Sequence, residues 1–552
     1  MNDNKITFVV YKTDDEKSKS LIETLGEITI PNGYESNVLV VNGGDISDKY
    51  QIYNKIIEIN DSKYKIYLNE NIELLSKDFL TDILDIFNSD ESIGIIGFSG
   101  AIKLSTHGIS LKSEKRCGKI YTGDSKELVD WSKSETEEKY QEVETVDNFF
   151  IATQYDIKWR DDLFIDDIFG ETAQCLEFKR KGYKSVVVNQ AEPVIWYKEN
   201  SFGVEAKDKE KFLDEYSKDL FPSVLILIPT FNRPKYFQNA LESALNQSYK
   251  NLDIVISDNS PNEDTKELIQ PYLEKNKHIK YFYHHEFDAN DNWNFLRQYQ
   301  KNDTEHEFVN WLMDDDAFLP NKIEIMMEAM LNNPDVSLVT SARNFIDGEG
   351  NYIKSYEWLD NVVKIAGEEI GKKLLMTYHN YVGEPTTVLI RKSCLRDGDL
   401  CWNDDENGFF AYIDISTWLQ LLSKGNMIWI NEPLSMFRIH EDQATFWAQT
   451  KIRFNIEWLK LLLCAWNKKI FLKTEEDLRE TLLIWFTVTV KHTLWLTYDN
   501  DYQSKDLNEL KKLLSEVSKA LISNNYKIKH KIISKSLIEG AEEKKFVTVS
   551  QF

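Results

Sequence analysis

The sequence predicts an α/β protein with two doubly wound domains in tandem, followed by a C-terminal helical region. Apolar stretches of strand length alternate with helical segments twice along the chain, within residues 1–205 and again within 222–445. Polar motifs follow the ends of these predicted strands, where doubly wound domains bind their ligands. Beyond residue 446 the apolar residues have helical spacing alone.

Composition narrows the class of protein. A chain of 552 residues exceeds one ordinary core, and 42% hydrophobic residues with 11 prolines indicate packed domains. The net charge of −25 argues against nucleic acid as a partner, because its field repels phosphate backbones. The five cysteines show no CxxC pattern, which predicts reduced thiols.

We expect a cytoplasmic protein, because the N-terminus lacks a signal-peptide pattern and no apolar stretch is long enough to form a transmembrane segment.

In the first domain, residues 5–11 and 36–44 are apolar stretches that predict the first two strands. Residues 64–87 read as a strand, a polar turn and a helix, in the same order as residues 307–331 of the second domain. This similarity predicts a pseudo-repeat. The charged segment 206–221 predicts a linker helix between the two domains.

In the second domain, strands are predicted at residues 223–228, 252–258, 279–285 and 307–314. Helical spacing separates them at residues 265–275 and 292–301. The region 446–552 repeats helical spacing, with Thr474 as a helix start. Its tryptophans favour core or subunit contacts, and a homo-oligomer could form through these helices.

Residues Asp314, Asp315 and Asp316 end an apolar stretch. Adjacent carboxylates at the end of a buried strand repel one another, so they favour a bound cation. Oxygen ligands of this kind suit Mg²⁺ or Mn²⁺. The alternative is a solvated acidic turn, and the triplet alone does not decide between them.

The order of the polar motifs is more informative. PTFNR (229–233), SDNS (257–260), MDDDAFLP (313–320), GEPTTVLIRKS (383–393), YIDISTWLQLLSKG (412–425) and INEPLSMFRIHEDQAT (430–445) succeed one another. This series resembles the family-two glycosyltransferases of GT-A type, over about residues 222–445. The resemblance implies a nucleotide-binding domain that transfers a sugar, usually with inversion, from a nucleoside diphosphate.

For the donor, the resemblance implies that Thr230, Asn232 and Arg233 lie in the nucleotide-binding loop. Asp258 would accept a hydrogen bond from a uracil N–H, although an Asx-turn with Ser260 is an alternative role.

The resemblance also implies a metal site. Asp314 and Asp316 match the family's DxD pair, which binds Mn²⁺ or Mg²⁺ and through it the sugar diphosphate. Asp315 would contact the ribose or face solvent. His440 matches a position that coordinates the metal or touches the diphosphate, and Arg438 adds positive charge nearby.

The general base implied by the resemblance is Asp414, at the start of an apolar helix. The family commonly has Glu-Asp at this point, whereas this chain has Ile413-Asp414. A helix cap is the alternative role of Asp414.

The first domain is similar to the glycosyltransferase modules of the StrF-like group, through residues 94–104, 147–164 and 174–188. Asn69-Glu70-Asn71 stands at its DxD position, and amides bind a divalent metal more weakly than carboxylates do. A non-catalytic or acceptor-binding role is therefore expected for this domain.

The sequence thus predicts a metal-dependent, inverting glycosyltransferase that moves a hexose from a UDP-sugar to a glycan on a glycoprotein. Glucose is the first candidate for the hexose. In its two-module organisation the chain resembles enzymes that extend sugars on streptococcal serine-rich adhesins. Two alternatives are a transferase for a surface polysaccharide precursor and a non-catalytic carbohydrate-binding or scaffolding subunit.

Overall fold

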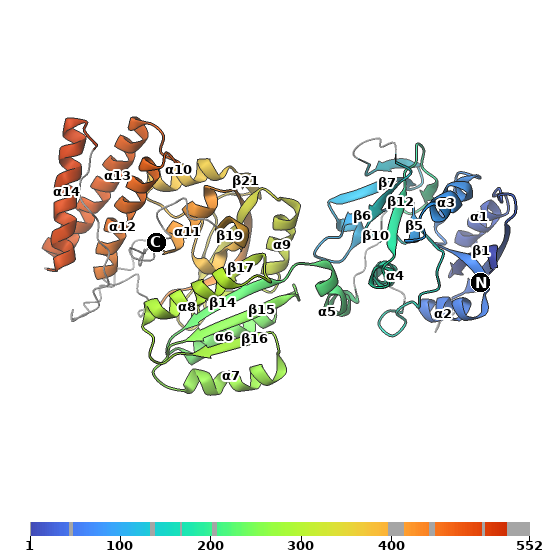
Figure 1. Ribbon diagram of the computed structural model, residues 1–552, viewed down its shortest axis with the longest axis horizontal. Helices are drawn as coiled ribbons and strands as arrows, with labels where there is room; N and C mark the ends of the chain where they lie inside the picture. The colour runs from blue at the N-terminus through green and yellow to red at the C-terminus, as the bar shows by residue number, and fades with distance from the viewer. Residues whose placement is uncertain are drawn as a thin grey trace. The chain divides into compact units, whose positions relative to one another are not determined.

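The computed structural model describes residues 2–43, 48–132, 138–165, 168–200, 202, 207–395, 413–440, 448–499 and 503–526. The chain divides into two compact units, residues 1–221 and 222–552. Figure 1 shows that each unit contains a twisted sheet with helices packed around it.

The first unit is built on a seven-stranded sheet in which β1 lies between two parallel neighbours. Its strands, in sheet order, are β2 (Glu35–Asn42), β1 (Asn2–Lys12), β3 (Ser62–Leu68), β11 (Phe150–Thr153), β5 (Ile93–Gly97), β12 (Lys184–Val188) and β9 (Tyr140–Val143). A smaller sheet contains β10 (Thr145–Val146), β6 (Ser99–Lys103), β7 (Lys115–Thr122), β13 (Ile195–Tyr197), β4 (Ile72–Leu74) and β8 (Glu127–Asp130). The helices are α1 (Asp15–Leu25), α2 (Lys49–Ile59), α3 (Phe79–Ser89), α4 (Ile168–Arg180) and α5 (Lys209–Leu220).

Helix α5, which falls within the predicted linker, packs on the first unit. Its Phe212 is fully buried and stacks on Phe169 of α4, with ring centroids 4.8 Å apart. Arg180 of α4 lies 2.8 Å from the Glu215 carboxylate of α5. The helix is therefore an integral part of the first unit.

The second unit contains a ten-stranded sheet. The strands on its main path are β16 (Ile279–Tyr283), β15 (Leu252–Asp258), β14 (Val224–Thr230), β17 (Phe308–Trp311), β22 (Leu389–Arg391), β19 (Val336–Ile346), β23 (Asn426–Arg438) and β18 (Ala317–Phe318). β20 (Tyr352–Tyr356) and β21 (Val363–Ile365) pair with β19 and β23. The helices around it are α6 (Pro234–Leu245), α7 (Asp264–Lys275), α8 (Ala289–Asn302), α9 (Lys322–Asn332), α10 (Gly367–Thr377) and α11 (Ile413–Leu422).

Six neighbouring strands of each main sheet share one topology. In the first unit the order β2-β1-β3-β11-β5-β12 has the pairings parallel, parallel, antiparallel, antiparallel and parallel. In the second unit β15-β14-β17-β22-β19-β23 has the same series of pairings. The structure therefore confirms the predicted class, with two related α/β domains in tandem followed by helices, and it supports the pseudo-repeat.

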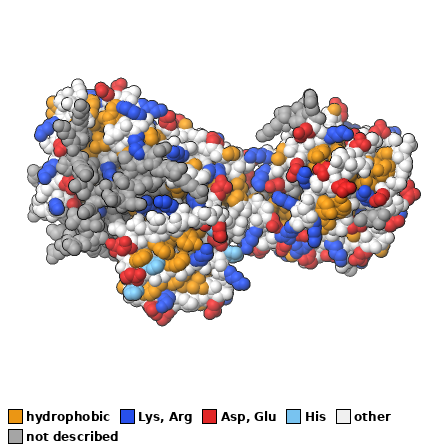
Figure 2. Space-filling view, viewed as in Figure 1, with side chains coloured by type: hydrophobic (Ala, Val, Ile, Leu, Met, Phe, Trp, Pro, Cys, Tyr) orange, Lys and Arg blue, Asp and Glu red, His pale blue; other side chains and the backbone are white. Residues whose placement is uncertain are grey.

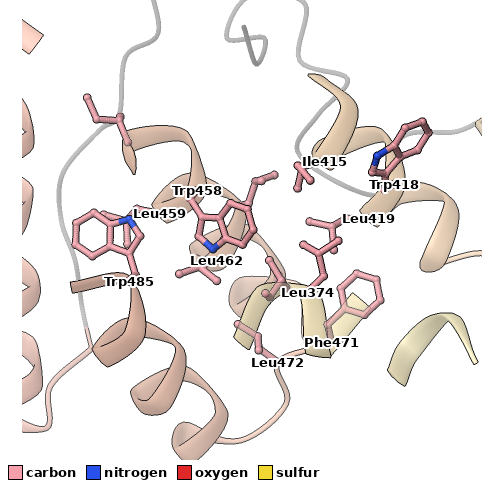
Figure 3. Packing of buried hydrophobic residues seen from close by; sticks show 14 of the residues in the cluster. Leu374, Ile415, Trp418, Leu419, Trp458, Leu459, Leu462, Phe471, Leu472 and Trp485 are labelled. Carbon is pink, nitrogen blue, oxygen red and sulfur yellow. The ribbon is translucent and has the colours of Figure 1, made fainter. Parts of the chain in front are cut away.

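The helices α12 (Ala448–Asn467), α13 (Glu475–Leu494) and α14 (Lys505–Ser523) follow the second sheet. Thr474 caps α13 in a capping box with Asp477, as its position predicts. Figure 3 shows Trp458 of α12 between Trp485 of α13 and Ile415 of α11, with Leu374 of α10 close to Trp458. These residues belong to one hydrophobic cluster, so the helices share a core with the preceding domain. The boundary predicted at residues 445–446 lies outside the described residues.

Cysteine chemistry differs from the expectation at one position. Cys117, Cys175 and Cys394 are free, but Cys464, buried in α12, is disulfide-bonded. The prediction of reduced thiols throughout the chain was therefore wrong for Cys464, because dispersed spacing along the sequence does not exclude pairing in space.

Two properties of the surface bear on partners. Figure 2 shows acidic and basic side chains interspersed over the visible face of both units. Within the described parts of the chain, none of the helices combines the length and apolar character needed to cross a membrane.

Candidate functional site

The aspartate triplet lies in a tight turn just beyond the carboxyl end of β17, at the centre of the second sheet. The amide of Leu312 donates to the carbonyl of Leu227 on β14, and the amide of Asp316 donates to the carbonyl of Met313. The strand is therefore shorter than predicted. The turn places the triplet where doubly wound domains bind ligands.

Asp314 connects the triplet to the loop after β14. Its Oδ2 accepts hydrogen bonds from the Thr230 hydroxyl at 3.0 Å and the Phe231 amide at 3.2 Å. Burial, and then the negative charge of Asp315, raise the pKa of Asp314 to about 7. Asp314 is thus a buried carboxylate that holds its charge poorly without a compensating cation.

Asp316 faces the opposite side of the turn and is 1% exposed. Its Oδ2 accepts from the Thr386 hydroxyl at 2.5 Å, and its Oδ1 accepts from the Arg438 amide at 3.0 Å. Burial and the neighbouring Asp315 raise the pKa of Asp316 well above its ordinary value. Asp316 therefore ties β17 to the segment before β22 and to the end of β23.

Asp315 is the carboxylate of the triplet that contacts His440. His440 Nε2 lies 2.9 Å from Asp315 Oδ2, and Arg233 Nη1 lies 3.0 Å from the same oxygen. Arg233 is also 3.5 Å from Asp314 Oδ1. The loop after β14, the triplet and the end of β23 thus converge on one carboxylate.

Arg438 is held in place by backbone groups. Its Nε donates to the Asp315 carbonyl at 2.7 Å, and its Nη1 donates to the Asp347 carbonyl at 3.0 Å. The guanidinium also lies over the ring of Tyr236, 4.7 Å from the ring centroid. Arg438 therefore braces the turn that carries Asp315.

The other predicted donor-binding residues lie at the ends of neighbouring strands. Asp258 ends β15 fully buried, and it accepts from the Ser260 amide at 2.8 Å and the Tyr281 hydroxyl at 2.6 Å. The predicted Asx-turn is therefore present, and the uracil contact stays a prediction. Asn232 has a φ of 53°, a left-handed conformation that asparagine tolerates better than most residues do, and its amide donates to Ser260 Oγ at 2.8 Å.

Asp414 is the second residue of α11 and is half-buried. Burial raises its pKa to about 7, and the negative charge of Glu384 adds to the shift. Glu384 also raises the pKa of Asp316. Residues 383–386 contact both Trp418 of α11 and Asp316, so α11 lies on the same side of the unit as the triplet.

Helix α11 is anchored beside this carboxylate. Trp418 Nε1 donates to the Gly383 carbonyl at 2.9 Å. Gly383 has a φ of 107°, and a Cβ at this position would meet Thr387 Oγ1 at 2.5 Å, so the turn requires glycine.

The sequence did not indicate two of the residues that support the site. Tyr236, in the first turn of α6, packs on His440 with ring centroids 5.4 Å apart, as well as on Arg438. Thr386 donates its hydroxyl to Asp316 and accepts from the Met313 amide at 3.1 Å. Both lie inside or beside the quoted motifs, but their partners are distant in sequence, and spacing alone does not show such contacts.

A second group of potential metal ligands, Asp303, Glu305 and His306, precedes β17. Both ring nitrogens of His306 contact carboxylates, with Nδ1 2.9 Å from Asp303 and Nε2 2.8 Å from Asp253. The ammonium group of Lys392 also contacts Asp303. Because these charges are already paired, we interpret the group as a structural network at the amino end of the strand.

The residues of the triplet fit a divalent cation. The Asp314 and Asp315 carboxylates with the His440 nitrogen form a hard oxygen and nitrogen donor set, which suits Mg²⁺ or Mn²⁺. Arg233 contacts both carboxylates, which shows that this position already attracts positive charge. Asp316, the other predicted ligand, has both of its oxygens hydrogen-bonded within the protein.

Comparison with known proteins agrees with this geometry. Residues 225–398 match the model of glycosyl transferase family 2, and residues 7–216 match that of a glycosyltransferase-like family. A GalNAc(5)-diNAcBac-PP-undecaprenol beta-1,3-glucosyltransferase of Campylobacter jejuni is 27% identical over 262 residues, which are 47% of this chain and 79% of that protein. An uncharacterized glycosyltransferase of Rickettsia typhi is 26% identical over 230 residues, which are 41% of this chain and 66% of the relative.

Among solved structures, S. aureus TarS 1–349 in complex with UDP-GlcNAc is 15% identical, with a TM-score of 0.38 over 55% of this chain and 89% of that one. That likeness is too distant to carry an argument about the site. The chain spans only 30% of a related uncharacterized glycosyltransferase of Rickettsia bellii. The family matches are the stronger finding: residues 225–398 match glycosyl transferase family 2, and most of the first unit matches a glycosyltransferase-like family.

Proposed function

We propose that the second unit is an inverting, metal-dependent glycosyltransferase that moves a hexose, first of all glucose, from a UDP-sugar to a glycan acceptor. The observation that carries the proposal is the convergence of Arg233 and His440 on Asp315 at the carboxyl end of the sheet. The name of the Campylobacter relative, a glucosyltransferase, supports glucose as the first donor to test.

In this proposal Asp314, Asp315 and His440 hold the divalent cation, which offsets the charge of the leaving diphosphate. Asp316 is predicted from the sequence as a ligand, but in this structure its oxygens accept from Thr386 and Arg438, so it would have to exchange one of these bonds to contact the cation. Arg233, which lies beside Asp314 and Asp315, would supply a charge-assisted hydrogen bond to the diphosphate. Thr230, Asn232 and Asp258 lie at the strand ends that would receive the nucleoside.

Asp414 is the general base of the proposed reaction. Its carboxylate takes the proton of the acceptor hydroxyl while that oxygen attacks the anomeric carbon and the bond to the diphosphate breaks. A pKa of about 7 suits a base that works near neutral pH, because the carboxylate is partly ionised yet basic enough to accept the proton.

The proposal is tested by UDP release from UDP-glucose, UDP-galactose and UDP-N-acetylglucosamine, with Mn²⁺ and with EDTA. We expect release that depends on the metal, and loss of roughly a hundredfold in rate for Asp315→Asn. Asp264→Asn, at an exposed position on α7, is the matched control. Release of pyrophosphate instead of UDP would indicate a nucleotidyltransferase, and no turnover of any donor would favour a binding or scaffolding subunit.

The acceptor has two candidate classes. A glycan on a glycoprotein, such as a serine-rich adhesin, stays a prediction, as does a cytoplasmic location. A polysaccharide precursor on a lipid carrier is the second candidate, because the Campylobacter relative is named for an undecaprenol-linked acceptor. Mass spectrometry of products formed on a glycopeptide and on a lipid-linked oligosaccharide distinguishes them.

A further inference from the structure

The first unit contains a cavity at the position that corresponds to the donor site of the second. The cavity has a volume of about 190 Å³. Its lining is mostly polar and aromatic and includes Lys49, Tyr53, Glu70, Asn71, Asn148 and Trp159. Asn69 follows β3 directly, and β3 occupies the same place in its sheet as β17 does in the second unit. The cavity of the first unit therefore lies at the strand end that corresponds to the triplet of the second.

The polar contacts of the two sites correspond. In the second unit Asp314 accepts hydrogen bonds from the hydroxyl of Thr230 and the amide of Phe231. In the first unit Glu70 accepts from the Thr13 hydroxyl, and also from the Thr13 amide at 2.8 Å. In both units a carboxylate after β3 or its counterpart β17 thus fixes the loop after β1 or its counterpart β14.

The charges at the two sites differ. Glu70 Oε2 also accepts from the Asp14 amide at 3.2 Å, so both oxygens of Glu70 have donors. The Glu171 carboxylate lies 2.6 Å from Lys49 Nζ and accepts from the Tyr50 hydroxyl at 2.7 Å. These two carboxylates are therefore committed to partners within the first unit.

A sugar diphosphate does not suit this cavity. Lys49, the cation among its described lining residues, is already paired with Glu171. Strand β12, which corresponds to β23, is followed by Asn189 and Gln190, where β23 ends at Arg438 and leads to His440. Two carboxylates with one cation leave the lining with a negative charge, and this disfavours a dianion.

A neutral sugar suits the cavity better. Asn71 and Asn148 line it half-buried, and within the described parts of the chain their side-chain amides make no hydrogen bond. Amides of this kind both donate to and accept from hydroxyl groups. Tyr53, Tyr67 and Trp159 form a packed aromatic floor, with Tyr53 and Tyr67 centroids each 5.0 Å from that of Trp159.

The volume sets the size of the ligand. Sites for drug-sized ligands usually measure about 300–1,000 Å³, and the 190 Å³ found here is smaller. The cavity therefore has room for one sugar ring rather than a whole nucleotide sugar.

We propose that this cavity binds one neutral sugar residue of the acceptor or product glycan, without a metal ion. The inference rests on the proposed function, since it takes the glycan to be the one that the second unit extends. The first unit would then hold the chain while the second adds to it, which raises the effective concentration of the acceptor.

The test is saturation-transfer NMR on the full-length protein in EDTA, with the methyl glycosides of glucose, galactose and N-acetylglucosamine as probes. We expect at least one glycoside to bind, and the double variant Asn71→Ala, Asn148→Ala to bind it about tenfold more weakly, because each lost hydrogen bond costs a few-fold. Asn32→Ala, at an exposed turn of the same unit, is the control and keeps the wild-type affinity. Thermal unfolding of the double variant verifies that it folds.

Three outcomes would overturn the inference. No glycoside binds in EDTA, the folded double variant binds the glycoside as well as wild type does, or wild type binds UDP in EDTA and the double variant does not, which would make the cavity a nucleotide site. The Asp315→Asn variant separates this inference from the proposed function. It should lose UDP release but retain glycoside binding. A wild-type protein that releases UDP but binds no glycoside contradicts the inference alone, and one that binds the glycoside but turns over no donor contradicts the proposed function alone.

Discussion

Among single residues, Asp414 has a raised pKa that should affect both the stability of the protein and the proposed reaction. Its ordinary pKa is 3.8, and burial in the folded protein raises this to about 7. The folded state therefore binds the proton more tightly than the unfolded chain does. As pH rises from about 4 through 7, ionisation favours the unfolded chain, so Asp414 progressively destabilises the protein. The same ionisation makes the carboxylate competent as a base.

We predict that transfer by the wild type, measured as kcat/KM at saturating metal, falls about tenfold per pH unit below pH 7. Asp414→Asn should lose most transfer but keep donor affinity, because the amide cannot accept the proton. The variant should be more stable than wild type at pH 8 but not at pH 4, as followed by urea unfolding. Equal losses of donor affinity and rate would indicate a structural role for Asp414.

A second prediction at this scale concerns Arg233. Arg233→Ala removes the cation beside Asp314 and Asp315, which in the proposed function contacts the donor diphosphate. Donor KM should rise about tenfold with a smaller change in kcat, since a charge-assisted hydrogen bond contributes about 1.5–3 kcal/mol. Steady-state kinetics with UDP-glucose would show this, and Lys235→Ala on the adjacent helix turn is the control. An unchanged KM would place the diphosphate elsewhere.

The residue types of the site were predictable from sequence, but their pairing was not. The motifs indicated Asp314, Asp315, Asp316 and His440, because strand ends and polar residues are local features. Which carboxylate meets His440 depends on the direction in which each side chain leaves the turn between Met313 and Asp316. That direction is set by contacts with the segment before β22, far away in the sequence.

Among the elements, α11 couples the proposed base to the helical region. Its Ile415, Trp418 and Leu419 are buried in the cluster that also contains Trp458 and Trp485 (Figure 3). Helical spacing predicted these helices, since it is local. That they share a core with α11 could not be predicted, because apolar spacing shows which face is buried but not what covers it.

We therefore predict that Trp485→Ala in α13 destabilises the second unit by about 3–5 kcal/mol. The side chain is fully buried, and its Nε1 donates to the Asn455 carbonyl at 2.7 Å. Leu483→Ala, on the same helix but 49% exposed, should change stability by less than about 0.5 kcal/mol. Urea titrations, with loss of UDP release as the measure of unfolding, would give the stability of both variants. A Trp485→Ala protein as stable as wild type would show that the helices do not support this core.

For the whole molecule, the two units share a sheet topology but have different side chains at equivalent strand ends, after β3 and after β17. The second unit gathers cations around its carboxylates, whereas the first pairs Glu70 and Glu171 with groups of its own. The depleted motif was visible in the sequence as Asn69-Glu70-Asn71. The cavity was not, because Trp159 and Glu171 reach it from segments about a hundred residues away.

The two units should separate functionally. We predict that a protein of residues 222–552 releases UDP from its donor at a rate comparable with the full chain, whereas residues 1–221 release none. Each fragment follows the division between compact units. Circular dichroism would verify folding before the assay. A folded but inactive 222–552 fragment would show that the donor site requires the first unit.

The shared core also has a consequence for biosynthesis. The triplet is translated early in the second unit, but α11 buries its apolar face against helices that extend to residue 523. During synthesis from the N-terminus, a nascent chain that ends before α12 still lacks Trp458 and Trp485, which complete the core around α11. The emerging protein would therefore fold its donor-binding strands before it could fix Asp414, and so gain affinity for the nucleotide sugar before it gains the ability to use it.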